Sequence, residues 1–570
     1  MMLLPSLGLP HLSRLNPPRS TDERLAGALV WLLALMLLVF LAWPLACILV
    51  KAVQDRAGQF VGMANMLAMA GETRLLDAAW SSCRLAGLTT ILVLPLAMAF
   101  AFALTRSRLW GKPFWRLVAL SPMLAPSLMP AISLVYLFGN QGLLKGWLGE
   151  TSIYGPLGIV LGEAFYTFPH ALLILTTSLA MADARLYEAA EVLGAGKLRR
   201  LLTITLPNSR YGLLAAAMVV FTLVVTDFGV PKVIGGQTNV LALEAYKQVI
   251  GQQNFGKGAV IGLLLLVPAL LSCGVERWLA HGHGATTSGR SVGYRARRNP
   301  ARDILLGLLC AGICLCLLLM LITAVAASLI KLWPYDLSLT LIHYDFDQVD
   351  GGGWQAFANS LELATWTALG GAGMVFLVAY LLEKTPAPRW PAAVIRTLAL
   401  LPMAVPGLVL GLGYIFCFNA PGNPLHGLYG GMTILVAATI AHFYTTAHLT
   451  IGTALRQIDA EIEAVARGLG RAWWTSCRRV TLPIVLPALL DVVRYLFVAG
   501  MTTVSCVIFL YTPDTVLASI AVLNMDDAGD TAAAAAMASL IVASSLAATL
   551  LINLLGWWLK RRTQGWRATP

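Results

Sequence analysis

Twelve long apolar runs constrain the fold of this chain more than any other feature. Each holds about 20 to 28 residues, which is enough for an α-helix to cross the hydrocarbon core of a bilayer. Every backbone N–H and C=O in that core needs an internal partner, so runs of this length predict helices. Only 12% of the 570 residues are charged and 58% are hydrophobic, whereas soluble domains carry about 25% charged residues. We therefore expect an all-α polytopic membrane protein with about twelve transmembrane helices.

The runs fall into two sets of six, separated by a polar, basic and Gly-containing stretch at 281–302 that predicts a flexible linker. The expected spans are 25–50, 79–105, 115–138, 157–180, 209–230 and 258–280, then 303–330, 360–382, 394–417, 428–452, 484–511 and 531–558. The predicted organisation is a tail at 1–24, a first domain at 25–280, the linker at 281–302, a second domain at 303–558 and a tail at 559–570.

The two sets repeat each other in sequence. The segment SPMLAP at 121–126 matches LPMAVP at 401–406, and Phe-Tyr-Thr at 165–167 matches 443–445. An even number of spans in each half gives both halves the same orientation, which is a parallel repeat. Proline lacks an N–H and breaks helices. The third and ninth spans are therefore expected to be broken, at Pro122, Pro126, Pro130, Pro402 and Pro406.

The basic residues predict the topology. Thirty of the 40 Lys and Arg residues lie in the two tails, the linker and alternate loops, nine lie on the opposite side, and Arg494 lies within a span. Because cytoplasmic loops carry the excess of Lys and Arg, both termini and the linker are expected in the cytoplasm. This distribution accounts for the net charge of +12, so no nucleic acid partner is expected.

One basic loop of the first half carries the sequence YEAAEVLGAGKLRRLLTITLP at 187–207. Glu188 to Leu193 are good helix formers, Gly194 is placed to end that helix, and Pro207 is tolerated in the first turn of the next span. A second, degraded copy runs from 463 to 483, with 13 residues from glycine to proline in both copies. Together they predict two helix–turn–helix knobs on the cytoplasmic surface.

The order E-A-A, three residues, G, nine residues, I-x-L-P resembles the cytoplasmic coupling loop of binding-protein-dependent ABC importer permeases. The resemblance implies two fused permease domains of the type I importer fold in a bacterial inner membrane. It also implies two ATPase subunits, one on each loop, and a periplasmic substrate-binding protein on the outer face. The residues that it assigns to ATPase coupling are Glu188, Ala189, Ala190, Gly194, Ile204, Leu206, Pro207, Glu463, Ala464, Gly470, Leu482 and Pro483.

The second copy departs from this pattern at its first position. Ala464 stands where the first copy has Glu188, and Glu463 comes one residue earlier. One residue is a turn of about 100° on a helix, so Glu463 points elsewhere. We therefore expect two unequal ATPase contacts, with that of Glu463 exposed and weaker.

The chain itself is not expected to bind nucleotide. Gly194 to Lys197 resembles the end of a phosphate-binding loop, but Glu191 and Leu198 stand where that loop needs Gly and Ser or Thr. ATP and Mg²⁺ are therefore assigned to a separate ATPase, and this chain is expected to be a permease without cofactors or enzymatic activity.

Ionisable residues inside spans mark transport pathways by default. Asp227 is the first candidate, with Lys232 as a possible ion-pair partner, and Glu163 and Glu362 come next. A structural role is the alternative for each, and it leads for Glu362. Histidines 170, 442 and 448 are not spaced as metal ligands on one helical face, so no metal site is expected.

The substrate remains open between members of one branch. Single-chain permeases with two halves resemble the importers of ferric iron, thiamine and 2-aminoethylphosphonate. The stretches 226–236, 246–254 and 522–530 are most similar to the 2-aminoethylphosphonate permeases, and ferric iron is the second choice. An ion-coupled secondary carrier could also have twelve spans in parallel halves, but it would need no ATPase, and the paired loops argue against it.

Overall fold

The computed structural model describes residues 21–55, 58–181, 183–282, 294, 296 and 299–563, and these are almost entirely helical. The predicted tails and linker lie mainly outside these residues. Where the structure does describe them, the helices are longer than expected. The first long helix already begins at Thr21, and the last one continues to Thr563.

The first half contains six candidate spans with short helices between them. They are α1–η1–α2 (Thr21–Ala52), α4 (Thr73–Arg106), α5–η2 with α6 (Lys112–Leu124 and Leu128–Phe138), α7 (Pro156–Ala180), α9–η4–α10 (Lys197–Thr226) and α13 (Phe255–Gly282). The short elements are α3 (Ala64–Ala70), η3 (Lys145–Leu148), α8 (Ala184–Val192), α11 (Gly229–Ile234), α12 (Leu241–Tyr246) and η5 (Lys247–Gly251).

The second half repeats this order. Its spans are α14 (Pro300–Leu329), α15 (Gly353–Lys384), α16–η8 with α17 (Arg389–Ala404 and Gly407–Phe418), α18 (Met432–Arg456), α20–η10–α21 (Trp473–Thr502) and α23 (Thr531–Thr563). Its short elements are β1 (Ile330–Leu332), β2 (Asp336–Leu339), η6 (Ile342–Tyr344), η7 (Phe346–Gln348), η9 (His426–Leu428), α19 (Ala460–Gly468), η11 (Pro513–Thr515) and α22 (Ala518–Ala528). β1 and β2 pair as an antiparallel hairpin.

The third and ninth spans are broken, as the prolines predict. The described residues hold ten helices long and apolar enough to cross a membrane, or twelve if each bent pair counts as one span. The bend is 101° between α5–η2 and α6 and 117° between α16–η8 and α17. Pro122 and Pro402 are each the second residue of a 3₁₀ turn immediately before the bend, where the missing N–H removes an α-helical hydrogen bond.

The predicted fifth and eleventh spans are too long. α10 ends at Thr226 and α21 ends at Thr502. After each of these helices the chain turns away, with extended backbone at Asp227 and at Thr503. Apolarity alone did not reveal these ends, because the residues that follow are also buried inside the protein. Val504 to Leu510, for example, form buried turns rather than helix.

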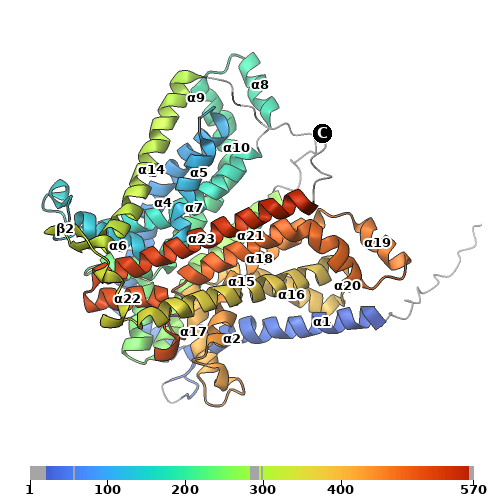
Figure 1. The fold of residues 1–570 in the computed structure, drawn as a ribbon. Helices are drawn as coiled ribbons and strands as arrows, with labels where there is room; N and C mark the ends of the chain where they lie inside the picture. Colours follow the sequence, from blue (N-terminus) through green and yellow to red (C-terminus); the bar gives the residue numbers. More distant parts are fainter. Residues whose placement is uncertain are drawn as a thin grey trace, which may run out of the picture.

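The two halves exchange their first helices. α1 packs against α16 and α2 against α17, whereas α14 packs against α4, α5 and α6. Figure 1 shows two arms that meet near α22 and α6, of which one carries α8 together with α14 and the other carries α19 together with α1. The two domains predicted from the sequence are therefore interlocked rather than separate bodies.

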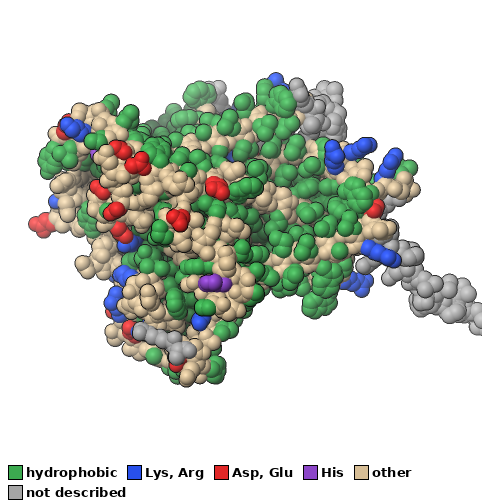
Figure 2. All heavy atoms as spheres, turned by 60° about the horizontal axis from the view of Figure 1, so that its bottom comes forward, with side chains coloured by type: hydrophobic (Ala, Val, Ile, Leu, Met, Phe, Trp, Pro, Cys, Tyr) green, Lys and Arg blue, Asp and Glu red, His purple; other side chains and the backbone are tan. Residues whose placement is uncertain are grey.

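Most of the long helices leave apolar side chains on the outer surface. α14 exposes Ile304, Leu305 and Leu308 by 63–69%, as expected for a helix against lipid tails. Figure 2 shows a broad hydrophobic belt over the long helices. Acidic side chains gather toward the end that carries β2, where some Lys and Arg also lie, and the opposite end shows Lys and Arg with few acidic side chains. This is the charge asymmetry on which the topology prediction rests.

Candidate coupling surface and translocation path

The first of the two predicted coupling loops forms a helix–turn–helix. Asp183 immediately precedes α8, and its carboxylate caps the helix by accepting the Arg185 N–H at 3.0 Å. Gly194, two residues after the end of α8, has a φ of +71°. The Ala195 N–H reaches back to the Ala190 carbonyl at 2.9 Å, which is the closing bond of a left-handed glycine cap.

The second loop has the same geometry despite its degraded sequence. Asp459 accepts the Glu461 N–H at 3.1 Å at the start of α19, and Gly470 has a φ of +66°. The Arg471 N–H donates to the Ala466 carbonyl at 3.0 Å. Both loops then pass through a π-helical turn into the next span. The two loops therefore share one backbone register, in which Ala464 stands at the position of Glu188.

The knobs expose polar and apolar side chains together. Glu188 is exposed, and so are Leu193 and Leu198, by 84% and 68%. At the matching positions Leu469 and Trp474 are exposed by 72% and 45%. Of the other predicted coupling residues, Ala189, Pro207 and Ala464 are exposed, whereas Ala190, Ile204, Leu206, Leu482 and Pro483 are partly buried. The motif did not single out the leucines, although their equal spacing from Gly194 and Gly470 was a usable signal.

Glu463 does not make the exposed contact that the sequence predicted. It is only 5% exposed, and its Oε2 lies 3.5 Å from Lys384 Nζ. Its Oε1 accepts a hydrogen bond from the Thr481 hydroxyl at 3.2 Å. The turn of about 100° relative to Ala464 directs this side chain into the protein, toward the end of α15, and not outward.

Two carboxyl groups of the first half meet inside the membrane layer. Glu163 lies on α7 and is completely buried, and Asp227 follows the last residue of α10. The two side chains are close enough to interact. Asp227 Oδ2 also accepts the Val230 N–H at 2.8 Å, at the start of α11. Apart from Asp227, no described residue has an N–H or O–H donor hydrogen-bonded to a carboxylate oxygen of Glu163.

Two tyrosines complete this cluster, and sequence reasoning missed both. Tyr166 lies one turn after Glu163 on α7, within electrostatic reach of both carboxyl groups and of Tyr495. Tyr495 belongs to α21, so the cluster spans the boundary between the halves. Only the repeat of Phe-Tyr-Thr drew attention to Tyr166, and no sequence signal connects Tyr495 to it.

The other predicted pathway residues lie elsewhere. Glu362 is exposed on the same face of α15 as Trp366 and Leu369, so the structure does not bring it to Asp227. Lys232 is not the ion-pair partner of Asp227, because its Nζ lies 2.9 Å from Asp527 Oδ1 on α22. That ion pair instead joins the two halves.

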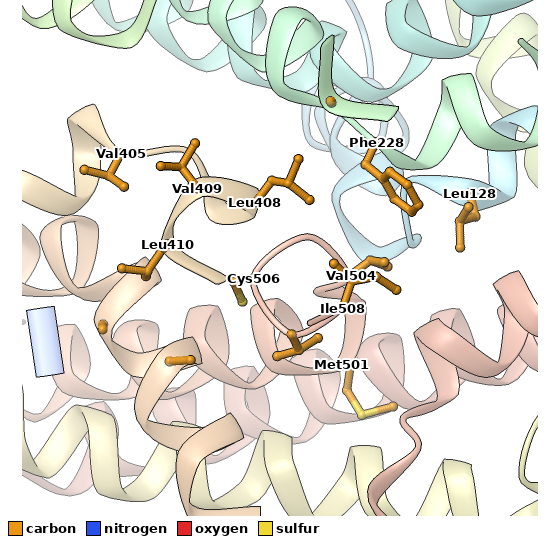
Figure 3. Packing of buried hydrophobic residues seen from close by; sticks show 14 of the residues in the cluster. Leu128, Phe228, Val405, Leu408, Val409, Leu410, Met501, Val504, Cys506 and Ile508 are labelled. Carbon is orange, nitrogen blue, oxygen red and sulfur yellow. The ribbon is translucent and has the colours of Figure 1, made fainter. Parts of the chain in front are cut away.

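Next to the carboxyl pair, the halves close against each other through apolar side chains. Figure 3 shows Phe228 and Leu128 of the first half beside Val504 and Ile508 of the second. Phe228 is 1% exposed and Ile508 also 1%. Aromatic rings continue this contact between the halves. The ring centroid of Tyr246 lies 4.8 Å from that of Phe228 and 6.2 Å from that of Phe509. The part of the chain that the structure describes has no group of three or more His, Cys, Asp or Glu residues arranged for a metal ion.

Comparison with known proteins agrees with this architecture. The model of the family described as "binding-protein-dependent transport system inner membrane component" matches residues 92–282 and 375–562. These two matches contain both of the predicted coupling loops and cover most of the chain. The chain therefore belongs to this family, and it is a multi-pass inner-membrane permease of an ABC importer.

Individual relatives match either the whole chain or one half. The ferric transport system permease protein FbpB from Actinobacillus pleuropneumoniae is 25% identical over 531 residues, which cover 90% of this chain and 75% of that protein. The molybdenum transport system permease protein ModB from Escherichia coli is 27% identical over 218 residues, 36% of this chain and 95% of ModB. One half of this chain thus corresponds to a complete permease subunit of the second kind.

Proposed function

We propose that this chain is the membrane subunit of an ATP-driven importer, with one separate ATPase bound to each knob and a periplasmic binding protein on the opposite face. The observation that carries the proposal is the pair of knobs. Two loops of one backbone geometry, each with a left-handed glycine and an exposed leucine at matching positions, offer surfaces of similar shape to two copies of one partner. An ion-coupled carrier has no use for such surfaces.

The carboxyl pair supports a cationic substrate. Buried carboxylates are expensive in a membrane and are kept where they line a substrate path. Glu163 and Asp227, with the phenol groups of Tyr166 and Tyr495, form a set of oxygen groups that suits a hard metal cation. Ferric iron is such a cation, and a relative that covers most of the chain is named a ferric transport permease. We therefore propose ferric iron as the substrate.

2-Aminoethylphosphonate is the second candidate, for a specific reason. The three stretches that resemble its permeases are joined in space. The ion pair of Lys232 with Asp527 connects the first stretch to the third, and the ring contact of Phe228 with Tyr246 connects the first to the second. A protonated amine would also be attracted by two carboxylates. Thiamine, which is a cation as well, is kept as a third substrate in the same test.

The test is uptake by the reconstituted complex. The chain would be co-expressed with a candidate ATPase and a candidate secreted binding protein from the same genome, and the complex would be placed in proteoliposomes. We expect ATP-dependent uptake of radiolabelled ferric iron, and no ATP hydrolysis by the chain alone. Uptake of 2-aminoethylphosphonate or thiamine instead would overturn the substrate. Uptake that needs an ion gradient and no ATPase would overturn the class.

A further inference from the structure

In each knob, the residue immediately before the first position of the motif (Glu188 or Ala464) contacts a cationic side chain from the second span of the same half. Glu463 precedes Ala464 and meets Lys384, the last residue of α15, at 3.5 Å. Tyr187 precedes Glu188, and its ring lies 4.7 Å below the guanidinium carbon of Arg106, the last residue of α4. The two halves thus place a cation at one point by different chemistry, an ion pair in one and a cation–π contact in the other.

Each of these residues also reaches the start of the fifth span of its half. The Tyr187 hydroxyl is hydrogen-bonded to Thr205 at 3.1 Å, and Glu463 accepts from Thr481 at 3.2 Å. Thr205 and Thr481 stand at the same distance from Gly194 and Gly470 and end the π-helical turns before α10 and α21. One side chain therefore joins three elements, namely the knob helix and two spans.

Each cation also donates to a backbone carbonyl close to its knob. Arg106 Nη2 donates to the Leu179 carbonyl near the end of α7 at 2.9 Å, and Lys384 Nζ donates to the Ile458 carbonyl in the turn between α18 and α19 at 2.8 Å. All members are buried, with Arg106 2% and Tyr187 8% exposed, and Lys384 and Glu463 side chains 5% and 7%. Buried contacts are screened little by solvent and break at a large cost.

We propose that Tyr187 and Glu463 are positioning residues that lock each knob helix to the second and fifth spans of its half. A displacement of the knob by its ATPase then moves these spans together with it. Knobs attached only through their flanking turns would pivot on Gly194 and Gly470 and transmit less movement. This inference rests on the proposed function, since it assumes that an ATPase moves the knobs.

The contact found in the first half suggests a rescue experiment for the second half. Lys384→Met leaves the Glu463 carboxylate buried without its cation, while the double substitution Lys384→Arg with Glu463→Tyr installs the chemistry of the first half in the second. Glu383→Gln is the matched control, because Glu383 adjoins Lys384 but pairs with the more exposed Arg456 at 3.0 Å. The first-half counterpart is Tyr187→Phe, which keeps the ring over Arg106 and loses only the bond to Thr205.

Two readouts separate this inference from the proposed function. The first is amide hydrogen exchange of residues 460–468 in the purified full chain without ATPase. Lys384→Met should increase the exchange rate by about tenfold or more, the double substitution should restore it to within about twofold, and the control should leave it unchanged. The second is the number of substrate molecules imported per ATP hydrolysed in the complex, which should fall with Lys384→Met and recover with the double substitution.

The outcomes are distinct. Unchanged exchange in Lys384→Met would overturn the inference, and so would lost protection that the double substitution fails to restore. A normal import ratio in Lys384→Met, despite increased exchange, would also overturn it, because the lock would then have no part in transmission. Exchange that responds as expected in a chain to which no ATPase binds would support the lock and reject the proposed function.

Discussion

At the scale of single residues, the two halves differ most in the membrane carboxyl groups. The Phe-Tyr-Thr repeat places Ala441 at the position of Glu163, and the coupling-loop register places Thr503 at that of Asp227. A structural need common to both halves would have kept acids in both. A carboxylate within a bilayer is unfavourable. Because the acids are present in one half alone, they favour a role in the single substrate path over a structural role.

Neutral isosteric substitutions test the role of Glu163 and Asp227 in the substrate path. Glu163→Gln and Asp227→Asn should each reduce uptake by about tenfold or more, which corresponds to roughly 1.4 kcal/mol of lost interaction. The Asn side chain can still accept the Val230 N–H, so folding should survive. The measurement is substrate uptake beside ATPase co-purification, with Glu362→Gln as the exposed control. Normal uptake by a variant would contradict a pathway role for that residue. Loss of the variant chain from the membrane would show that the residue is structural.

Gly194 and Gly470 allow a second test at this scale. Both have positive φ, +71° and +66°, and an added Cβ would meet nothing within 4 Å. Alanine should therefore cost only the conformational strain of about 1–2 kcal/mol, whereas proline, fixed near −65°, cannot adopt this backbone. ATPase co-purification should fall moderately for Gly→Ala and be lost for Gly→Pro at either position. Tolerance of proline at one knob would show that this knob does not need its turn.

At the scale of elements, the sequence predicted the knobs well and their attachment poorly. Helix-forming residues, a glycine and a proline at fixed spacing are local signals, so α8 and α19 could be predicted with the correct register. The direction of Glu463 could not, because it depends on Lys384 at the end of another helix. The bends of the third and ninth spans were visible from proline, whereas the early ends of α10 and α21 depend on tertiary packing.

The outer surfaces of the knobs should bind their ATPases unequally. Glu188 is exposed on α8, and Ala464 occupies its place on α19. A hydrogen bond to a charged group contributes about 1.5–3 kcal/mol, so Glu188→Ala should weaken ATPase docking roughly ten- to a hundredfold. The converse change, Ala464→Glu, should strengthen it. The measurement is the affinity of the purified ATPase for each variant, and a gain from Glu188→Ala would contradict the assignment.

At the scale of the whole molecule, the number of spans and their parallel repeat could be predicted from the sequence, but not the exchange of α1–α2 and α14 between halves. Each half has a complete set of apolar runs, and nothing local indicates which half a run packs against. The electrostatic interaction of Tyr166 with Tyr495 likewise could not be seen in one sequence. The apolar contact between the halves around Phe228 and Ile508, and the carboxyl cluster beside it, can therefore be seen only in the folded structure.

The charge asymmetry gives a topology that can be measured. Reporters fused after Pro570 and inserted at Gly289 should both read cytoplasmic, because the basic loops and tails lie on one side. An insertion in the β1–β2 hairpin, at Tyr335, should read periplasmic and serves as the control. A periplasmic signal at the C-terminus would place both knobs on the wrong side of the membrane for an ATPase.

The exchange of helices predicts what happens when the chain is divided in the linker. Residues 1–290 and 291–570 should accumulate and bind ATPase when expressed together, since relatives such as ModB have chains that match one half.

Either fragment alone should be lost from the membrane. Separation removes the packing of α2 on α17 and of α14 on α6. It also breaks the bonds of Ser133 to the Met320 carbonyl at 2.7 Å and of Trp333 to the Tyr136 carbonyl at 3.1 Å. Inside a bilayer such contacts and close packing, not water exclusion, hold helices together. Quantitative blotting of membranes measures the outcome, and stable accumulation of the first fragment by itself would show that the exchange does not hold the halves together.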